Sequence, residues 1–181
     1  MMMLMVGGSK SGKSSLAQAL AVRLSGGGKR FYLATMIPGD GEDRARIARH
    51  LEDRAGMGFE TVEQGRNLPA CFDRLDREGT VLLDSVTALL TNEFFPPERG
   101  YTPDENAGQR VAADILALRS RVRNLVIVAD DLFRDGGRYD ETTESYRKNL
   151  GGVLCRLAEN ADTVVEMTMG NPVVHKGVLE P

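Results

Sequence analysis

Short apolar runs alternate with longer amphipathic stretches along the whole chain. The short runs are typical of buried strands and lie at residues 1–6, 31–35, 59–62, 80–83, 125–129 and 163–167, with a candidate edge strand at 172–176. The longer stretches predict helices after residue 12 and at residues 42–54, 68–77, 86–94, 105–121 and 141–160. Strands that alternate with helices predict an α/β fold, with a mainly parallel sheet and helices on both faces.

The length of the chain fits one domain. Its 181 residues are enough for a sizeable core. The sequence has no internal repeat, so residues 1–181 are predicted to form a single domain. Residues 95–103 contain prolines and a glycine that exclude regular structure and predict an exposed loop.

The charge and composition of the chain argue against some classes of binding partner. A net charge of −3 and a pI near 5.5 argue against a nucleic-acid partner, which normally requires a basic surface. The apolar start is too short for a signal peptide or a membrane span, and no later stretch reaches spanning length. Cys71 and Cys155 lack metal-like spacing and are interpreted as buried residues in a reducing compartment. We therefore expect a soluble cytoplasmic protein.

The candidate chemistry begins at a glycine-rich segment directly after the first apolar run. It reads Gly-x-x-x-x-Gly-Lys-Ser and consists of Gly7, Gly8, Ser9, Lys10, Ser11, Gly12, Lys13 and Ser14. This is a complete P-loop pattern between a predicted strand and a predicted helix, so it predicts a single domain that binds a nucleoside triphosphate. We expect Lys13 to reach the β- and γ-phosphates and the Ser14 hydroxyl to bind Mg²⁺.

A P-loop enzyme usually holds Mg²⁺ with a second acid at the end of a neighbouring strand. Asp84 follows the apolar run at 80–83, whereas Asp130 and Asp131 follow the run at 125–129. We favour Asp84, because it comes directly after an apolar strand. Asp130 and Asp131 remain the alternative, and one of these acids could instead cap the following helix.

A second candidate lies on the predicted helix at 42–54. Arg46, His50 and Arg54 are spaced by four and share one helix face. An imidazole between two guanidinium groups is held mostly neutral, so it can attack phosphorus while the arginines stabilise phosphate charge. On spacing alone, the favoured interpretation is a solvated helix with charge pairs such as Asp43 with Arg46.

With these residues placed, the chain resembles the bifunctional adenosylcobinamide kinase/adenosylcobinamide-phosphate guanylyltransferase family of cobalamin biosynthesis. The resemblance spans nearly the whole chain. Its most specific part is Arg46-Ile-x-x-His50 downstream of Tyr-Leu-Ala-Thr. The shared segments are the P-loop, 32–35, 46–54, 61–63, 82–87, 91–92 and 161–176.

The resemblance implies two reactions: phosphorylation of adenosylcobinamide by ATP or GTP, and transfer of GMP from GTP to the phosphorylated product. It implies that His50 carries the GMP and that Ser14 and Asp84 are the Mg²⁺ positions. The remaining nucleotide contacts that it implies are Ala34, Thr35, Met36, Leu51, Glu52, Asp53, Arg54 and Glu63. It also implies a fold like that of RecA-type ATPases and a homotrimer in which one subunit completes a neighbour's site.

The chain departs from the family after the run at 125–129. Family members often carry Asn-Glu where this chain has Asp130-Asp131, and the following segment, 132–137, also differs. If that loop contacts the corrinoid or the second nucleotide site, a change in the kinase activity or in the acceptor preference is expected. Two alternatives are therefore kept: a P-loop kinase of another small molecule with a structural His50, and a nucleotide-dependent switch or assembly protein.

Overall fold

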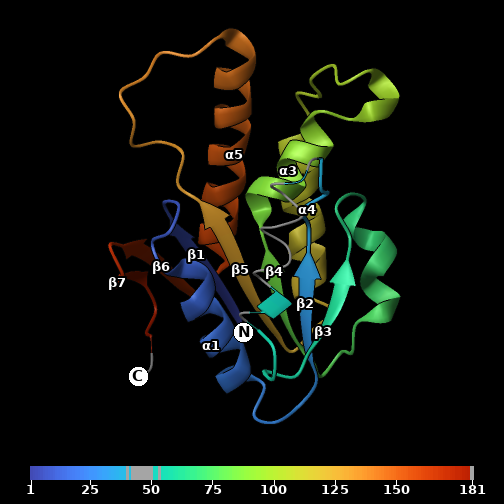
Figure 1. Cartoon of the computed structure of the whole chain (residues 1–181), viewed down its shortest axis with the longest axis vertical. Coiled ribbons are helices and arrows are strands. Elements are labelled where there is room, and N and C mark those ends of the chain that lie inside the picture. The colour runs from blue at the N-terminus through green and yellow to red at the C-terminus, as the bar shows by residue number, and fades with distance from the viewer. Residues whose placement is uncertain (40, 42–50, 53, 180–181) are drawn as a thin grey trace.

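The structure, a computed structural model, describes residues 1–39, 41, 51, 52 and 54–179 of the chain (Figure 1). Most of the predicted helix at 42–54 falls outside these residues. Three predicted site residues, Arg46, His50 and Asp53, therefore lie outside the described part of the chain.

Seven strands form one sheet in the order β3-β2-β4-β5-β1-β6-β7. Their bounds are β1 (Met2–Gly7), β2 (Arg30–Ala34), β3 (Phe59–Glu63), β4 (Thr80–Asp84), β5 (Asn124–Asp130), β6 (Thr163–Thr168) and β7 (Asn171–Lys176). Neighbouring strands are parallel except for β6 and β7, which form an antiparallel pair at one edge. The predicted strands, the mainly parallel sheet and the edge strand at 172–176 are thus confirmed.

Helices cover both faces of this sheet, as predicted (Figure 1). The helical elements described are α1 (Lys13–Leu24), α3 (Val86–Phe94), α4 (Ala107–Arg119), α5 (Glu141–Asn160) and the 3₁₀ helices η1 (Leu68–Arg74) and η2 (Pro97–Arg99). Helix α1 lies on one face, against β4, β5 and β1. Helices α3, α4 and α5 pack together on the opposite face. The helix predicted at 68–77 is shorter, because Leu75 already has an extended backbone.

The first strand shows why the sheet needs cover on both sides. Met2 and Leu4 belong to the core on the α3–α5 face, whereas Met3 and Met5 belong to the core on the α1 face. Successive strand residues point to opposite faces, so a strand buried on both faces must be apolar at nearly every position. The continuous apolar run at the start of the chain is therefore explained by its central place in the sheet.

Two further expectations can be compared with the structure. Cys71 is buried as predicted, but Cys155 is exposed, so that prediction is wrong. Helix α5 turns Leu150, Val153 and Leu157 into the core, and Cys155 lies on its other side. Across the described ranges, no helix combines the length and the apolar character needed to cross a membrane.

Candidate functional site

The P-loop connects the end of β1 to the start of α1. Lys10 and Gly12 have positive φ angles, of 58° and 90°, which turn the chain tightly around the loop. The loop packs closely on its neighbours, since a Cβ at Gly7 would lie 2.7 Å from Ser11 Oγ and 2.8 Å from the Met167 carbonyl oxygen. Only a residue without a side chain fits there, because real Cβ atoms essentially never come within 3.0 Å of another heavy atom.

Helix α1 begins without a side-chain cap. Gly12 occupies the N-cap position and no side chain accepts a hydrogen bond from the first turn. The free N–H groups and the positive end of the helix therefore remain available to an anion. Ser14, in the first turn, is half-buried, and its hydroxyl is suited to Mg²⁺ because that ion prefers oxygen ligands.

Lys13 is placed to meet phosphate from inside the loop. The residue is buried, its Nζ donates a hydrogen bond of 3.1 Å to the Gly8 carbonyl oxygen, and it lies 2.8 Å from a carboxylate oxygen of Asp130. Asp130 reaches it because β5 is the direct neighbour of β1, and the register places Asp130 level with Gly7. The ammonium group is thus held at the mouth of the P-loop.

The two candidate acids occupy different places. Asp84 ends β4, which is separated from β1 by β5, and it is level with Val128. Its carboxylate accepts a hydrogen bond of 2.8 Å from the Tyr32 hydroxyl. Asp130 is therefore the acid next to the P-loop lysine, and Asp84 faces a cavity farther along the sheet. Which of them holds Mg²⁺ stays a prediction.

That cavity, here called the β2–β4 cavity, has a volume of about 360 Å³. Its floor is formed by the carboxyl ends of β2 and β4 with Tyr32, Ala34 and Asp84, and β3 adds Thr61 and Glu63. Met36, Leu51 and Arg54 complete its wall. Six of the predicted nucleotide contacts are therefore brought together here: Ala34, Met36, Leu51, Arg54, Glu63 and Asp84.

Tyr32 and Arg54 form the polar wall of the β2–β4 cavity. The Arg54 guanidinium carbon lies 3.8 Å from the centre of the Tyr32 ring, a cation–π contact, and Arg54 also donates a hydrogen bond of 3.2 Å to Thr61 Oγ1. Burial, followed by the charge of Asp84, raises the pKa of the Tyr32 hydroxyl far above its usual value. Tyr32 therefore stays a neutral donor to Asp84 at physiological pH.

The remaining described contacts lie around this cavity. Thr35 is fully buried, and its Oγ1 exchanges hydrogen bonds with the backbone of Ser85, at 2.7 and 2.8 Å. The Asn92 side chain donates to the carbonyl oxygens of both Thr35 and Gly65, at 2.8 and 2.9 Å. Glu52 is exposed. Asn92 thus joins the segments after β2 and β3, which border the cavity on two sides.

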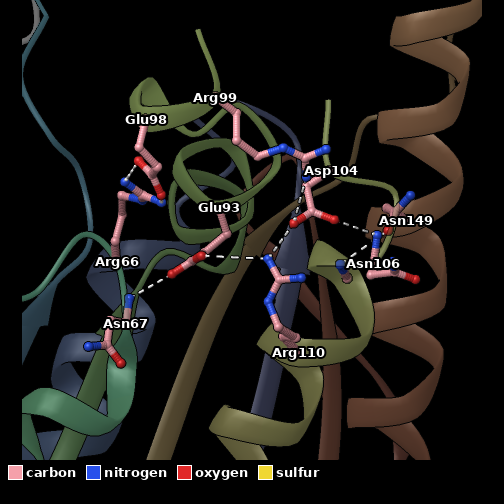
Figure 2. A network of polar contacts seen from close by, with 10 residues as sticks. Arg66, Asn67, Glu93, Glu98, Arg99, Asp104, Asn106, Arg110 and Asn149 are labelled. Carbon is pink, nitrogen blue, oxygen red and sulfur yellow. Dashed lines mark hydrogen bonds and ion pairs between the residues drawn. The ribbon is translucent and has the colours of Figure 1, made fainter. Parts of the chain in front are cut away.

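A polar network extends this support into the predicted loop at 95–103 (Figure 2). Arg66, which follows β3, donates two hydrogen bonds to Glu98, and the Asn67 backbone donates to Glu93. Arg110 of α4 lies 2.9 Å from an oxygen of Asp104. Among its described residues, the loop contains one regular element, the 3₁₀ helix η2. These contacts nevertheless attach it to the segment after β3 and to α4.

A second cavity, here called the P-loop cavity, lies on the other side of the loop and has a volume of about 270 Å³. It is bordered by Gly8, Ser9, Lys10 and Ser11, by the segment after β5, and by the turn between β6 and β7. Asp131 and Arg134 come from the first of these segments, and Met169 from the turn. Four of the eight predicted P-loop residues, Gly8 to Ser11, therefore border this cavity, whereas Lys13 and Ser14 are not among its lining residues and Asp84 lines the other cavity.

Several residues of both cavities were missed by the sequence analysis. Tyr32, Arg134, Glu166 and Met169 all lie in segments that the sequence analysis compared with the family, but none of them was predicted as a site residue. The signal for Tyr32 was present, because it lies two residues before Ala34 on the same strand face. His175 is exposed on the edge strand and lies 2.8 Å from Glu166.

The similarity of this chain to known proteins extends over nearly its whole length. The model of the family described as "Cobinamide kinase / cobinamide phosphate guanyltransferase" matches residues 3–174. The "Bifunctional adenosylcobalamin biosynthesis protein CobP" of Pseudomonas aeruginosa is 30% identical over 175 residues, 96% of each chain. A protein of Salmonella typhimurium, "Bifunctional adenosylcobalamin biosynthesis protein CobU", is 29% identical over 173 residues, 91% of this chain and 93% of that protein.

Among solved structures, one described as an ATPase domain superposes with a TM-score of 0.57 at 10% identity. The match covers 97% of this chain and 76% of that one. At this identity the likeness concerns the fold alone, and it confirms the predicted P-loop ATPase fold.

Proposed function

The chain belongs to the cobinamide kinase/cobinamide phosphate guanyltransferase family, and we propose that it performs both reactions on adenosylcobinamide. It phosphorylates the hydroxyl of the aminopropanol arm with a nucleoside triphosphate. It then transfers GMP from GTP to the new phosphate and yields adenosylcobinamide-GDP. The observation that carries the proposal is a P-loop with Lys13 at its mouth, within a chain that the family model covers from residue 3 to residue 174.

The P-loop binds the β- and γ-phosphates in this proposal. Backbone N–H groups from Gly8 to Ser14 and the start of α1 surround them, and Lys13 leaves Asp130 to pair with a phosphate oxygen. Mg²⁺ would be held by Ser14 and Asp84, whose hydroxyl and carboxylate oxygens suit that ion. When bound, it neutralises negative charge on the phosphates.

The β2–β4 cavity receives the guanosine of GTP. Its volume of about 360 Å³ lies within the usual range for small-molecule sites. The Glu63 carboxylate can accept from the N–H groups of a guanine edge. Arg54, held against Tyr32, adds positive charge on the phosphate side. Residues Ala34, Thr35, Met36, Leu51, Glu52 and Asp53 are the other contacts in this proposal.

His50 carries the GMP between the two substrates. An imidazole nitrogen attacks the α-phosphorus, the bond from that phosphorus to the bridging oxygen breaks, and pyrophosphate leaves with the electron pair. An oxygen of adenosylcobinamide phosphate then attacks the same phosphorus, and the P–N bond breaks. Arg46 stabilises the phosphate charge. Support comes from the spacing of Arg46, His50 and Arg54 in the sequence and from the family resemblance.

We also propose that the protein acts as a homotrimer in the cytoplasm, on the strength of the same resemblance. A neighbouring subunit would then complete the site around the segment that carries His50. Light scattering at micromolar concentration tests the trimer directly, and a monomer of 19.8 kDa would contradict it.

Incubation with α-labelled GTP and Mg²⁺ tests the proposed intermediate. The wild-type protein should acquire an acid-labile GMP adduct, and His50→Ala should acquire none. His175→Ala is the matched control and should label like the wild type, because His175 lies on the exposed edge strand. Equal labelling of wild type and His50→Ala would exclude the intermediate. Phosphorylation of an acceptor without any adduct would instead indicate a plain P-loop kinase.

A further inference from the structure

In the nucleotide placement just described, the P-loop cavity holds no part of the nucleoside, although Gly8 to Ser11 of the P-loop border it. The P-loop follows β1, which lies between β5 and β6 in the sheet, and the proposed function places the nucleoside over β2 and β4. A triphosphate that spans from the β2–β4 cavity to the P-loop therefore directs its terminal phosphate toward β6. The P-loop cavity lies at that end, bordered by the early P-loop residues and the β6–β7 turn.

Met169, in the turn beside this cavity, has an unusual conformation. Thr168 pairs with Asn171 across the turn, so Met169 and Gly170 form a two-residue hairpin loop. Their φ angles are 49° and 80°, as in a type I′ turn. The first position of such a turn strongly favours Asn or Asp, because a positive φ is costly for other side chains.

The Met169 side chain gains nothing from the fold that would offset this cost. It is 88% exposed, although it lines the P-loop cavity. Leu132 and Phe133, in the segment after β5, are also exposed apolar residues, and Phe133 approaches the Cβ position of Gly151 on α5. Leu132 and Phe133 stand in the chain between Asp131 and Arg134, which line the cavity, and exposed apolar side chains that gather in one patch are typical of a surface that contacts a ligand.

The polar lining of the cavity suits a hydroxyl that is to be phosphorylated. Asp131 is held by Arg134 at 2.6 Å, and Arg134 also pairs with Glu166. The Asp131 carboxylate is only 12% exposed, so its position is well defined. Ser11 is buried, and its Oγ has no hydrogen-bond partner within the part of the chain that the structure describes. A buried hydroxyl of this kind is expected to find a partner.

We propose that the P-loop cavity is the site where the corrinoid hydroxyl enters for phosphorylation, with the corrin ring resting outside on Met169, Leu132 and Phe133. This inference rests on the proposed function. A corrin ring with its amide side chains is far larger than 270 Å³, so only its hydroxyl-bearing arm enters. The apolar rim then contacts the ring, and Ser11 Oγ hydrogen-bonds the arm or the transferred phosphoryl group.

The chemical step places Asp131 as the proton acceptor. The acceptor oxygen forms a bond to the terminal phosphorus, and the bond from that phosphorus to the β–γ bridging oxygen breaks. The nucleoside diphosphate leaves with the electron pair, and the hydroxyl proton passes to the Asp131 carboxylate. The transition state of phosphoryl transfer is loose, so a weak base such as aspartate is sufficient in this role.

The substitution Met169→Asn tests the apolar rim without endangering the fold. Asn suits the type I′ turn, so thermal stability should be unchanged or higher. The KM for adenosylcobinamide in the kinase reaction should rise about tenfold, which is what losing one buried apolar contact costs. The KM for the nucleotide and the labelling by α-labelled GTP should not change. Val178→Asn is the control, because Val178 is 69% exposed but does not line the cavity.

The substitution Asp131→Asn tests the proton acceptor. The kcat of phosphorylation should fall about 100-fold or more, while labelling by α-labelled GTP stays within about twofold of wild type. A KM for adenosylcobinamide within about twofold in Met169→Asn, or an unchanged kcat in Asp131→Asn, would overturn the inference. Wild-type protein that neither phosphorylates adenosylcobinamide nor acquires GMP would overturn the proposed function instead.

Discussion

Lys13 and Asp130 form an ion pair of 2.8 Å at the P-loop, where the proposed function places the triphosphate. The lysine side chain is 10% exposed and the aspartate side chain 33% exposed, so the pair is shielded more than an ordinary surface pair. The family resemblance places Asn at position 130 in many relatives. In the proposed function, a phosphate group must therefore displace the Asp130 carboxylate from Lys13. The phosphate then binds close to the negative charge of that carboxylate.

We predict that Asp130→Asn binds GTP more tightly. The amide has nearly the shape of the carboxylate but no charge, so the dissociation constant should fall about 3- to 10-fold, or about 1 kcal/mol. Titration calorimetry with GTP at constant Mg²⁺ measures the change. Asp162→Asn is the control, since Asp162 forms an exposed pair with Arg119 away from the loop. Weaker binding by Asp130→Asn would show that Asp130, rather than Asp84, supports the metal ion.

Adjacent glycines of the P-loop should respond differently to alanine. A Cβ at Gly7 would lie 2.7 Å from Ser11 Oγ and 2.8 Å from the Met167 carbonyl, whereas a Cβ at Gly8 would meet nothing within 4 Å. Gly7→Ala should therefore lower the free energy of unfolding by about 1–3 kcal/mol and abolish thermal stabilisation by GTP. Gly8→Ala should retain both properties. A normal GTP response in Gly7→Ala would contradict the tight packing of the loop.

The fold and the P-loop were predictable because their signals are local. A glycine-lysine-serine pattern between an apolar run and a helix needs no knowledge of distant residues. Apolar runs in the sequence likewise identified the central strands, since strands buried on both faces have few polar positions, whereas the edge strand β7 is exposed along its whole length. The start of α5 has a local signal too, since Asp140 is a favourable N-cap residue and its side chain accepts from the Thr143 backbone.

The arrangement of the site was harder to predict, because it depends on strand order. Acids follow both β4 and β5, but only the placement of β5 beside β1 brings Asp130 to Lys13 and leaves Asp84 with Tyr32. The turn at Met169 was also invisible, because its sequence lacks the Asn-Gly or Asp-Gly signal of a two-residue hairpin. Tertiary contacts, rather than local preference, determine both features.

The Arg66–Glu98 pair predicts a pH dependence for the loop at 95–103 (Figure 2). Hydrogen bonds from Arg66 lower the pKa of the Glu98 carboxyl from 4.5 to about 2. Because the folded-state pKa is depressed, the contribution to stability is present above pH 4.5 and is lost as the pH falls toward 2. Glu98→Gln should therefore lower the urea midpoint at neutral pH, and the difference from wild type should shrink as the solution is acidified.

The effect of Glu98→Gln should also decrease in high salt, because the carboxylate is exposed and its charge is screened. Glu78→Gln is a suitable control, since Glu78 and Arg123 are exposed and 3.9 Å apart. Amide hydrogen exchange at neutral pH should locate the change in residues 95–103. A difference in urea midpoint that stays constant as the pH falls would show that the pair does not stabilise the loop.

Asn92 should act as a positioning residue for the β2–β4 cavity. Its amide donates to the carbonyl oxygens of Thr35 and Gly65, the segments that follow β2 and β3. Asn92→Ala leaves both carbonyl groups without this donor, so the free energy of unfolding should fall by about 1–3 kcal/mol. The KM for GTP in adduct formation should rise, because the segments after β2 and β3 lose the donor that joins them, whereas the maximal labelling rate should change little. Asn160→Ala is the control, because the Asn160 side chain donates an exposed hydrogen bond to the Arg156 carbonyl oxygen at the end of α5. Equal effects of the two substitutions on the KM would mean that Asn92 stabilises the fold without shaping the nucleotide site.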